Sequence, residues 1–514
     1  RRCSAQLAIT LSYFTTILST ALPGILFVSQ MACFLAIAGL IGARCASGLG
    51  LTFAGDLELV QVVINAEDFS KDESGRTFFT HADVSVYPNM ADREAGAVRT
   101  WMLVLEPNST DEELERLTQE FEGGQQSHPN RGEVPVVEGR LTEDQLRAVL
   151  NKTEYSGRVK FAEEDTFEKK IPRLESITEE DVQADGDRQR PSTTLQPSQT
   201  VQSMYPWNIQ SINADVVRGR GVGVNVYVLD TGIRTTHVLF GGRAFAAVDV
   251  AATGFLSVCA PGSTTCAADQ NGHGTHCAGT VGAATYGVAD GATIWAVKVL
   301  DDSGSGFASW SILAQQWVLS SGVRPAVVSM SLGGAGKSLA EQASLDFLVA
   351  DGVTVVVAAG NQNQDACNYN PAWIPSAITV ASYGGLAGSS SEKSYFSNYG
   401  TCIDVWAPGS SILSTYISND ASVGISSGTS MACPHVAGLA AIMYEDNPTA
   451  GSMTASQRWT LLTASQRSGY VTGIPTTPAT VNLVALAPTP APPPAPPPAT
   501  PSPTPSPTLS PTPS

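Results

Sequence analysis

Residues 428–435 read Gly-Thr-Ser-Met-Ala-Cys-Pro-His, and an apolar, helix-compatible run from Val436 to Tyr444 follows them. A serine at the start of a helix is ordinarily an N-cap or a turn residue. It becomes a nucleophile only when a base, a group that orients the base and donors for an oxyanion lie close to it. Ser430 is therefore a candidate nucleophile if the rest of the chain supplies these partners.

Two stretches upstream supply an acid and a base. An apolar β-run from Val226 to Leu229 ends in Asp230, and His273 stands between two glycines at the start of a small-residue helix. The order Asp, His, Ser along the chain is that of subtilisin and differs from the orders in chymotrypsin and the α/β-hydrolases.

These stretches resemble the subtilisin-like serine proteases, most closely the branch of proteinase K and aqualysin. The resemblance runs from about Tyr205 to Leu486. It implies a catalytic triad of Asp230, His273 and Ser430, which hydrolyses peptide bonds in polypeptide substrates and needs no cofactor for the chemistry.

The resemblance also implies an oxyanion donor and substrate-binding segments. Asn361 follows a small-residue stretch and would donate through its side chain, together with the backbone N–H of Ser430. The substrate would pair as an added strand, and small, uncharged walls predict apolar or aromatic P1 residues. The implied substrate-binding residues are Gly304, Ser305, Gly306, Ser331, Leu332, Gly333, Ala358, Ala359 and Gly360.

Family members often hold a structural Ca²⁺ ion. Asp404 and the carbonyl groups of Pro375 and Ala377 match the positions that build one such site in proteinase K. A carboxylate with backbone carbonyls is the hard-oxygen set that calcium prefers.

Six cysteines fall within the part that resembles the family. Cys367 and Cys402 match a bridge of aqualysin-like enzymes. Cys259 and Cys266 lie in an insertion between Asp230 and His273, where we expect them to close a small loop. The remaining two, Cys277 and Cys433, are expected to be buried free thiols, although their closeness to the site leaves a bridge open.

The bulk composition narrows the class of protein. The chain has 514 residues, of which 43% are hydrophobic, so it is long enough for about three domains with a sizeable core. Its net charge of −18 argues against a nucleic-acid partner, because phosphate binding needs a basic face. Nine cysteines make an odd count, so the chain is not a fully paired disulfide framework.

The N-terminal 50 residues read as an apolar leader. Residues 31–41 are typical of a signal-peptide h-region, with Met31 as a plausible initiator. The whole apolar span is also long enough for a membrane anchor, which stays open as an alternative. Residues 51–97 carry no usable motif and remain an unassigned pro-segment.

Residues 98–170 alternate β-runs with helices. An acidic helix is expected from a Ser-Thr cap through Phe121, and a second from the capping-box spacing at Thr142 to Leu150. Pro135 cannot donate to a ladder, so we expect its strand at a sheet edge. This order resembles the subtilase propeptide, a small α+β, ferredoxin-like domain of split-βαβ type that acts as intramolecular chaperone and inhibitor.

Three further segments complete the chain. Residues 171–202 are polar and Pro/Gln/Ser-bearing, as in an exposed linker, and we expect maturation there. Residues 203–486 alternate near-continuous apolar runs with helical segments, which predicts an α/β fold, a three-layer α/β/α sandwich with a parallel sheet. Residues 487–514 are Ala-Pro, Thr-Pro and Ser-Pro repeats, expected to be polyproline II and to serve as a cell-wall-associating spacer or as a linker to a further domain.

The sequence thus predicts a secreted, self-processing serine endopeptidase, made as a zymogen and monomeric. A membrane-anchored protease is one alternative. Another is a catalytically inactive wall glycoprotein whose subtilase domain is only a scaffold. The presence of Asp230, His273, Ser430 and Asn361 together argues against it, because no structural role requires all four.

Overall fold

The computed structural model describes residues 70–72, 76–88, 96–127, 134–165, 207–215, 220–384 and 391–488. The chain divides into two compact units, residues 1–68 and 69–514, and every described residue lies in the second. The leader, the maturation linker and nearly all of the Pro-rich tail lie outside the described residues. Within those residues, no helix has both the length and the apolarity needed to cross a membrane.

Residues 70–165 form a small domain with one sheet, whose strand order is β1-β2-β3-β7-β4-β6-β5. The four strands β7, β4, β6 and β5 are antiparallel neighbours in a β-α-β-β-α-β chain order, which is the ferredoxin-like arrangement. The elements are β1 (Ser70–Lys71), β2 (Thr77–His81), β3 (Val84–Tyr87), β4 (Val98–Leu105), α3 (Asp111–Thr118), β5 (Glu122–Gln126), β6 (Val136–Thr142), α4 (Glu143–Leu150) and β7 (Val159–Glu164).

Both helices of the small domain begin at capping boxes, with Thr110 before α3 and Thr142 before α4. The end expected for the first helix is wrong, because α3 stops at Thr118. Phe121 is 7% exposed and packs into the core of the sheet, so the chain has already left the helix and turned toward β5.

The expected edge position of the strand after Pro135 is also wrong. β6 lies between β4 and β5 inside the sheet. Pro135 precedes the first ladder residue, so its missing N–H costs nothing, and its carbonyl accepts a hydrogen bond from the Leu105 N–H at 2.8 Å. The strands β1 to β3 come from residues 51–97, for which no motif had suggested structure.

The larger domain is built on a mostly parallel sheet of order β10-β9-β11-β8-β12-β14-β16-β18-β23-β21, which β17 and β22 extend beside β16. All neighbours from β9 to β23 run parallel, whereas β10, β21 and β17 pair antiparallel to their neighbours. The strands are β8 (Asn225–Asp230), β9 (Ala244–Asp249), β10 (Ser257–Val258), β11 (Thr293–Lys298), β12 (Ala326–Met330), β14 (Thr354–Ala358), β16 (Ile378–Gly384), β17 (Ser391–Lys393), β18 (Val405–Pro408), β21 (Gln466–Ser468), β22 (Val471–Thr472) and β23 (Leu483–Ala485).

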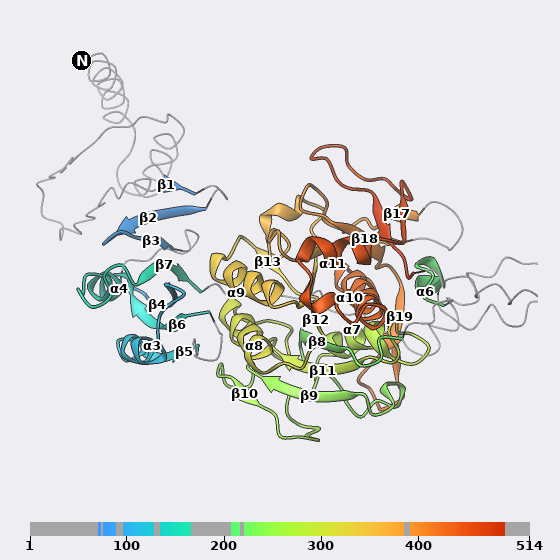
Figure 1. The fold of residues 1–514 in the computed structure, drawn as a ribbon, viewed down its shortest axis with the longest axis horizontal. Coiled ribbons are helices and arrows are strands. Elements are labelled where there is room, and N and C mark those ends of the chain that lie inside the picture. Colours follow the sequence, from blue (N-terminus) through green and yellow to red (C-terminus); the bar gives the residue numbers. More distant parts are fainter. Residues whose placement is uncertain are drawn as a thin grey trace, which may run out of the picture. The chain divides into compact units, whose positions relative to one another are not determined.

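Helices cover both faces of this sheet (Figure 1). Val226 and Val228 of β8 face α7 and α10, whereas Tyr227 and Leu229 face α8 and α9. The three-layer α/β/α prediction is confirmed. The remaining elements are α6 (Trp207–Ser211), α7 (His273–Gly282), α8 (Ala308–Ser321), α9 (Leu339–Ala350), α10 (Thr429–Asp446), α11 (Ala455–Leu462) and the two-stranded pairs β13 (Gly334–Ala335) with β15 (Tyr369–Asn370) and β19 (Ile412–Thr415) with β20 (Val423–Ser426).

Candidate active site

Asp230 is the last residue of the central strand β8, and its side chain is 0% exposed. Its carboxylate accepts hydrogen bonds from the Thr231 N–H at 2.7 Å and from Nδ1 of His273 at 2.7 and 2.9 Å. A buried carboxylate is costly unless it is paired in this way. The structure therefore joins the predicted acid to the predicted base.

His273 is the first residue of α7, and the glycines on either side of it are needed for close approach. Gly272 has φ of 104°, and a Cβ there would lie 2.7 Å from Cζ of Tyr416. A Cβ on Gly274 would collide with the carbonyl oxygen of Gly232. The chain thus brings α7 directly against the turn that follows β8.

The tautomer of His273 follows from its contacts. Nδ1 carries the proton that Asp230 accepts, so in the neutral imidazole the lone pair lies on Nε2. Nε2 is buried and has no hydrogen-bond partner among the described residues. The imidazole is therefore oriented as a base with its accepting nitrogen free.

Ser430 lies in the first turn of α10 and is 5% exposed. Its hydroxyl donates to the Ser331 carbonyl at 3.2 Å, and its own carbonyl accepts from the Ser331 hydroxyl at 2.7 Å. The thiol of Cys277 contacts the same carbonyl at 3.4 Å and lies 3.8 Å from Nδ1 of His273. The structure thus brings α7 and α10 together, but it holds the Ser430 hydroxyl on Ser331 and not on His273.

Asn361 follows β14 and points at the start of α10. Its Oδ1 accepts hydrogen bonds from the backbone N–H and the hydroxyl of Thr429 at 2.8 and 2.9 Å. These bonds fix the amide so that Nδ2 is the outward donor. Nδ2 lies 3.4 Å from the place a Cβ on Gly428 would take, so glycine leaves room for an oxyanion.

Two of the three predicted substrate segments flank Ser430. Residues 331–333 contact it through Ser331, and residues 358–360 reach α10 through the Gly360 N–H, which donates to Thr429 Oγ1 at 3.0 Å. The third, residues 304–306, is held by Asp301, whose Oδ1 accepts from the Ser305 N–H at 3.0 Å. No hydrogen bond within the described ranges joins that third segment to the candidate triad.

The proposed calcium ligands share one cavity of about 310 Å³, lined by Pro375, Ala377 and Asp404. Asp404 accepts from the Thr379 N–H at 2.8 Å, and burial raises the pKa of its carboxyl to about 6. The buried hydroxyl of Ser376, which also lines the cavity, has no hydrogen-bond partner among the described residues. Arg458 lines the same cavity and donates to the carbonyls of Met453 and Val349. The fit to a hard cation therefore rests on the carboxylate of Asp404 and the hydroxyl of Ser376.

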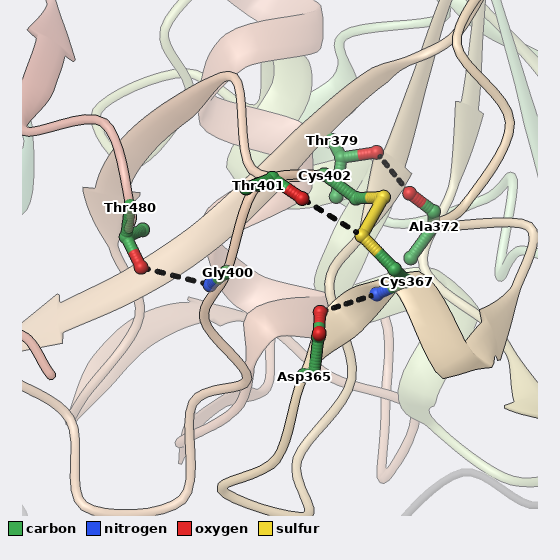
Figure 2. Close-up of a disulfide and its surroundings, with 8 residues drawn as sticks. All are labelled: Asp365, Cys367, Ala372, Thr379, Gly400, Thr401, Cys402 and Thr480. Atoms are coloured by element: carbon green, nitrogen blue, oxygen red, sulfur yellow. Dashed lines mark hydrogen bonds between the residues drawn. A yellow bond between two sulfur atoms is a disulfide. The ribbon is translucent and has the colours of Figure 1, made fainter. Parts of the chain in front are cut away.

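Two disulfides, Cys367–Cys402 and Cys259–Cys266, are the pairs expected from the sequence. Figure 2 shows Cys367–Cys402 tying the loop after β14 to the loop before β18, with Asp365 accepting from the Cys367 N–H at 3.0 Å. The thiols of Cys277 and Cys433 are free and buried. Burial raises the pKa of Cys277 well above its usual range and that of Cys433 to about 12, so neither is a thiolate at neutral pH.

His276 lies one turn beyond His273, but within the described residues no hydrogen bond joins its side chain to the candidate triad. Its Nε2 lies 2.9 and 3.1 Å from the carbonyl oxygens of Ile412 and Gly424, in the β19–β20 pair. Burial lowers the pKa of His276 to about 4, so it stays neutral. Its role is to hold α7 against that hairpin.

The sequence did not single out Thr231 and Asp269. Thr231 stands directly after Asp230, and its hydroxyl donates to Asp269 at 2.9 Å and accepts from the Gly274 N–H at 3.0 Å. The available signals were a threonine next to Asp230 and an aspartate four residues before His273, but only the folded chain shows that Thr231 and Asp269 contact each other and the start of α7.

Comparison with known proteins gives the family. The profile of the Subtilase family matches residues 221–480, half of the chain. The chain belongs to this family.

Each alignment covers only about half of this chain and 59–69% of the relative. It is 45% identical over 258 residues to an "Extracellular serine proteinase" of Thermus sp. (strain Rt41A), covering 49% of this chain and 59% of that protein. It is 41% identical over 290 residues to a "Subtilisin-like serine protease AsES" of Sarocladium strictum, covering 54% and 69%. A solved "cold adapted subtilisin-like serine proteinase" aligns with a TM-score of 0.49 and 37% identity over 55% of this chain and 99% of that one.

Proposed function

We propose that this protein is a serine endopeptidase in which Ser430 is the nucleophile, His273 the general base and Asp230 the group that orients the base. One observation carries the proposal: Nδ1 of His273 is bound to a fully buried carboxylate, while Nε2 is buried and unpartnered in the described part of the chain. Nδ1 of the structural residue His276 is also buried without a partner, so the pairing of His273 with a fully buried carboxylate is what distinguishes it.

The reaction begins when the Ser430 hydroxyl leaves the Ser331 carbonyl and turns toward Nε2 of His273. Ser430 Oγ then attacks the peptide carbonyl carbon as its proton passes to Nε2. Asp230 stabilises the resulting imidazolium. The carbonyl oxygen becomes an oxyanion, which accepts hydrogen bonds from Nδ2 of Asn361 and from the backbone N–H of Ser430.

The imidazolium next gives its proton to the amide nitrogen of the leaving peptide. The C–N bond breaks, and an ester between Ser430 and the acyl part of the substrate remains. Water then enters, loses a proton to Nε2 and attacks the ester carbon, and collapse of that intermediate returns the proton to Ser430. The buried disposition of Asp230 and His273 keeps the imidazole in one tautomer throughout.

The expected substrate is a polypeptide in extended conformation, with an apolar or aromatic P1 side chain. Ser331 to Gly333 offers backbone groups beside Ser430, and the small residues Ala358, Ala359 and Gly360 form an uncharged wall. Residues 304–306 would line the other side of the substrate strand. Strand pairing through backbone groups tolerates many sequences, so the specificity is broad.

The small domain is proposed as the propeptide, an intramolecular inhibitor and chaperone. Glu163 Oε2 accepts from the N–H groups of Leu339 and Ala340 at 3.0 and 3.2 Å, at the start of α9. Asp165 accepts from the N–H and the hydroxyl of Ser309 at 3.2 and 2.7 Å, at the start of α8. Two carboxylates thus cap two helices of the larger domain, as the helix dipole favours.

Secretion, maturation within residues 171–202, a monomeric mature enzyme and cell-wall association through the Pro-rich tail complete the proposal. Support for secretion comes from the apolar leader and from a relative that is named as extracellular. Calcium, where bound, would be held by Asp404 and the carbonyls of Pro375 and Ala377. It would supply stability and take no part in the chemistry.

The test is to express the full chain and its Ser430→Ala variant, and to determine the N terminus, size and location of each product. Self-processing predicts that only the unmodified chain loses roughly its first 170 to 200 residues and cleaves a peptide substrate. Two full-length, inactive products would favour the inactive scaffold. Identical cleavage of both would mean that another enzyme performs the maturation, and retention in the membrane would favour the anchored protease.

A further inference from the structure

The helix that carries His273 begins without a cap of its own. Its N-cap is Gly272, which has no side chain to accept a hydrogen bond. The first N–H groups of a helix have no partners within the helix, so buried ones need acceptors from elsewhere. Two neighbouring side chains, of Asp269 and Thr231, supply most of them.

Asp269 is 5% exposed, and its carboxylate binds N–H groups before and within the first turn of α7. Its Oδ1 accepts from the N–H groups of Asn271 and Gly272, each at 2.9 Å. Its Oδ2 accepts from the N–H and the hydroxyl of Thr275 at 2.8 and 2.7 Å. One carboxylate therefore fixes both the entry to the helix and its first turn.

Thr231 connects this carboxylate to the end of β8. Its backbone N–H donates to Asp230, its hydroxyl donates to Asp269 Oδ1 at 2.9 Å, and the same hydroxyl accepts from the Gly274 N–H at 3.0 Å. Thr231 is 0% exposed, so no water competes for these contacts. The acid and the base of the site are thus linked twice, once directly and once through Thr231 and Asp269.

The energetics make this second link sensitive to change. No ion pair to Asp269 occurs in the part of the chain that the structure describes, so its charge is held by hydrogen-bond donors alone. Charge-assisted bonds of this kind are about twice as strong as neutral ones. Losing a partner leaves a buried polar group unsatisfied, and the start of α7 must move to recover it.

We propose that Asp269, acting through Thr231, is a positioning residue that sets the imidazole of His273 against Asp230. It touches neither substrate nor the reacting atoms. Its effect on rate rests on the proposed function, whereas its effect on the His273–Asp230 contact does not.

The kinetic test compares Thr231→Val with Thr231→Ser, because valine keeps the shape and serine keeps the hydroxyl. Activity is expressed per active site, titrated with an irreversible serine-directed reagent. Since a displacement of about 1 Å in an active site can cost about 100-fold, we expect Thr231→Val and Asp269→Asn to lower kcat by about 10- to 100-fold with KM changed less than about twofold. Thr231→Ser should restore kcat to within about threefold of the unmodified enzyme.

Asp249→Asn is the matched control. Asp249 is also buried, at 8% exposure, and accepts hydrogen bonds from the N–H groups of Ala252 and Ala267 at 3.0 and 3.3 Å. Within the described residues, no hydrogen bond joins its side chain to α7. Its replacement should lower stability and leave kcat per titrated site unchanged.

A second measurement separates this proposal from the proposed function. In the full chain with Ser430→Ala, the proton that His273 Nδ1 donates to Asp230 should give a far-downfield proton NMR signal. Adding Asp269→Asn or Thr231→Val should shift or remove the signal, and adding Asp249→Asn should not. An unchanged signal in the first two would overturn the positioning role. A changed signal, together with no peptide cleavage by the chain that keeps Ser430, would uphold the positioning role and reject the protease.

Discussion

At the scale of single residues, the site depends on donors whose direction is fixed by a neighbour. Asn361 could point its amide either way, but the two bonds from Thr429 to Oδ1 leave only Nδ2 for the oxyanion. In the same way, Asp230 leaves only Nε2 of His273 for the role of base that we propose. Such preorganisation matters because the donors need not reorient while charge develops.

Asn361→Ala should lower kcat and leave KM nearly unchanged, since the lost hydrogen bond forms only with the oxyanion. The expected loss is about 10²- to 10³-fold, a scale carried over from the equivalent donor of subtilisin. Steady-state kinetics per titrated site give the answer. Asn363→Ala is the control, because Asn363 contacts Lys393 and not α10. A variant with unchanged kcat would remove Asn361 from the oxyanion site.

The sequence predicted Asp230, His273, Ser430 and Asn361 because each stands at a recognisable break in pattern, where an apolar strand or a small-residue run meets one polar group. Asp269 could not be recognised in this way. An aspartate four residues before a histidine is common in turns, and its five donors converge only after folding.

At the scale of elements, strand and helix positions followed closely from periodicity in the larger domain. The run from Val226 to Leu229 lies within β8, buried on both faces as a continuous apolar run predicts. The prediction failed where a single residue was given too much weight. Pro135 indicated an edge strand, yet it lies just outside β6, whose ladder partners on both sides decide its place.

The caps that join the two domains predict the strength of the inhibition that we propose for the small domain. Asp165→Asn should weaken its hold on α8, because hydrogen bonds to a charged group are worth about 1.5–3 kcal/mol, or about tenfold or more in affinity. The measurement is the fraction of peptidase activity that stays inhibited after maturation. Glu115→Gln removes the same charge from an exposed position of α3 and should have no effect. Equal inhibition in all three chains would contradict the capping role.

The same interface predicts a pH dependence. Burial, and next the charge of Asp165, raise the pKa of Glu138 to about 8, and Ser309 faces both carboxyl groups. A carboxyl whose pKa is raised in the complex contributes stability below its ordinary pKa, near 4, and loses it as pH rises through about 8. Inhibition should therefore weaken as pH rises from about 4.5 to about 8 and level off above that.

Glu138→Gln should abolish this weakening, because the amide has no proton to lose in that range. The remaining inhibited fraction is measured across the pH series for both chains, with activity corrected for the pH profile of the fully mature enzyme. Inhibition that weakens equally in both chains would assign the effect to other groups.

At the scale of the whole molecule, the fold explains why the site lies where it does. Asp230 ends β8, Ser331 follows β12 and Asn361 follows β14, so three neighbouring parallel strands deliver their functional residues to one edge of the sheet. α7 and α10 begin beside these strand ends, because His273 bonds to Asp230 and Ser430 bonds to Ser331.

Calcium removal should destabilise the larger domain without changing its chemistry. The cavity at Asp404 lies beside Pro375 and Ala377, next to β16 and well separated in sequence from the candidate triad. An ion present at about 100 times its Kd contributes about 2.7 kcal/mol, so chelation should lower the Tm of the Ser430→Ala chain by about 5 °C or more. Asp404→Asn should lower the Tm in calcium and make the Tm insensitive to chelation.

The Tm shift on calcium binding should also depend on pH. Without the ion, burial raises the pKa of Asp404 to about 6, so stability falls as pH rises through that value. Calcium should reverse this trend because it binds the carboxylate. A Tm that is the same with and without calcium at pH 8 would reject this site.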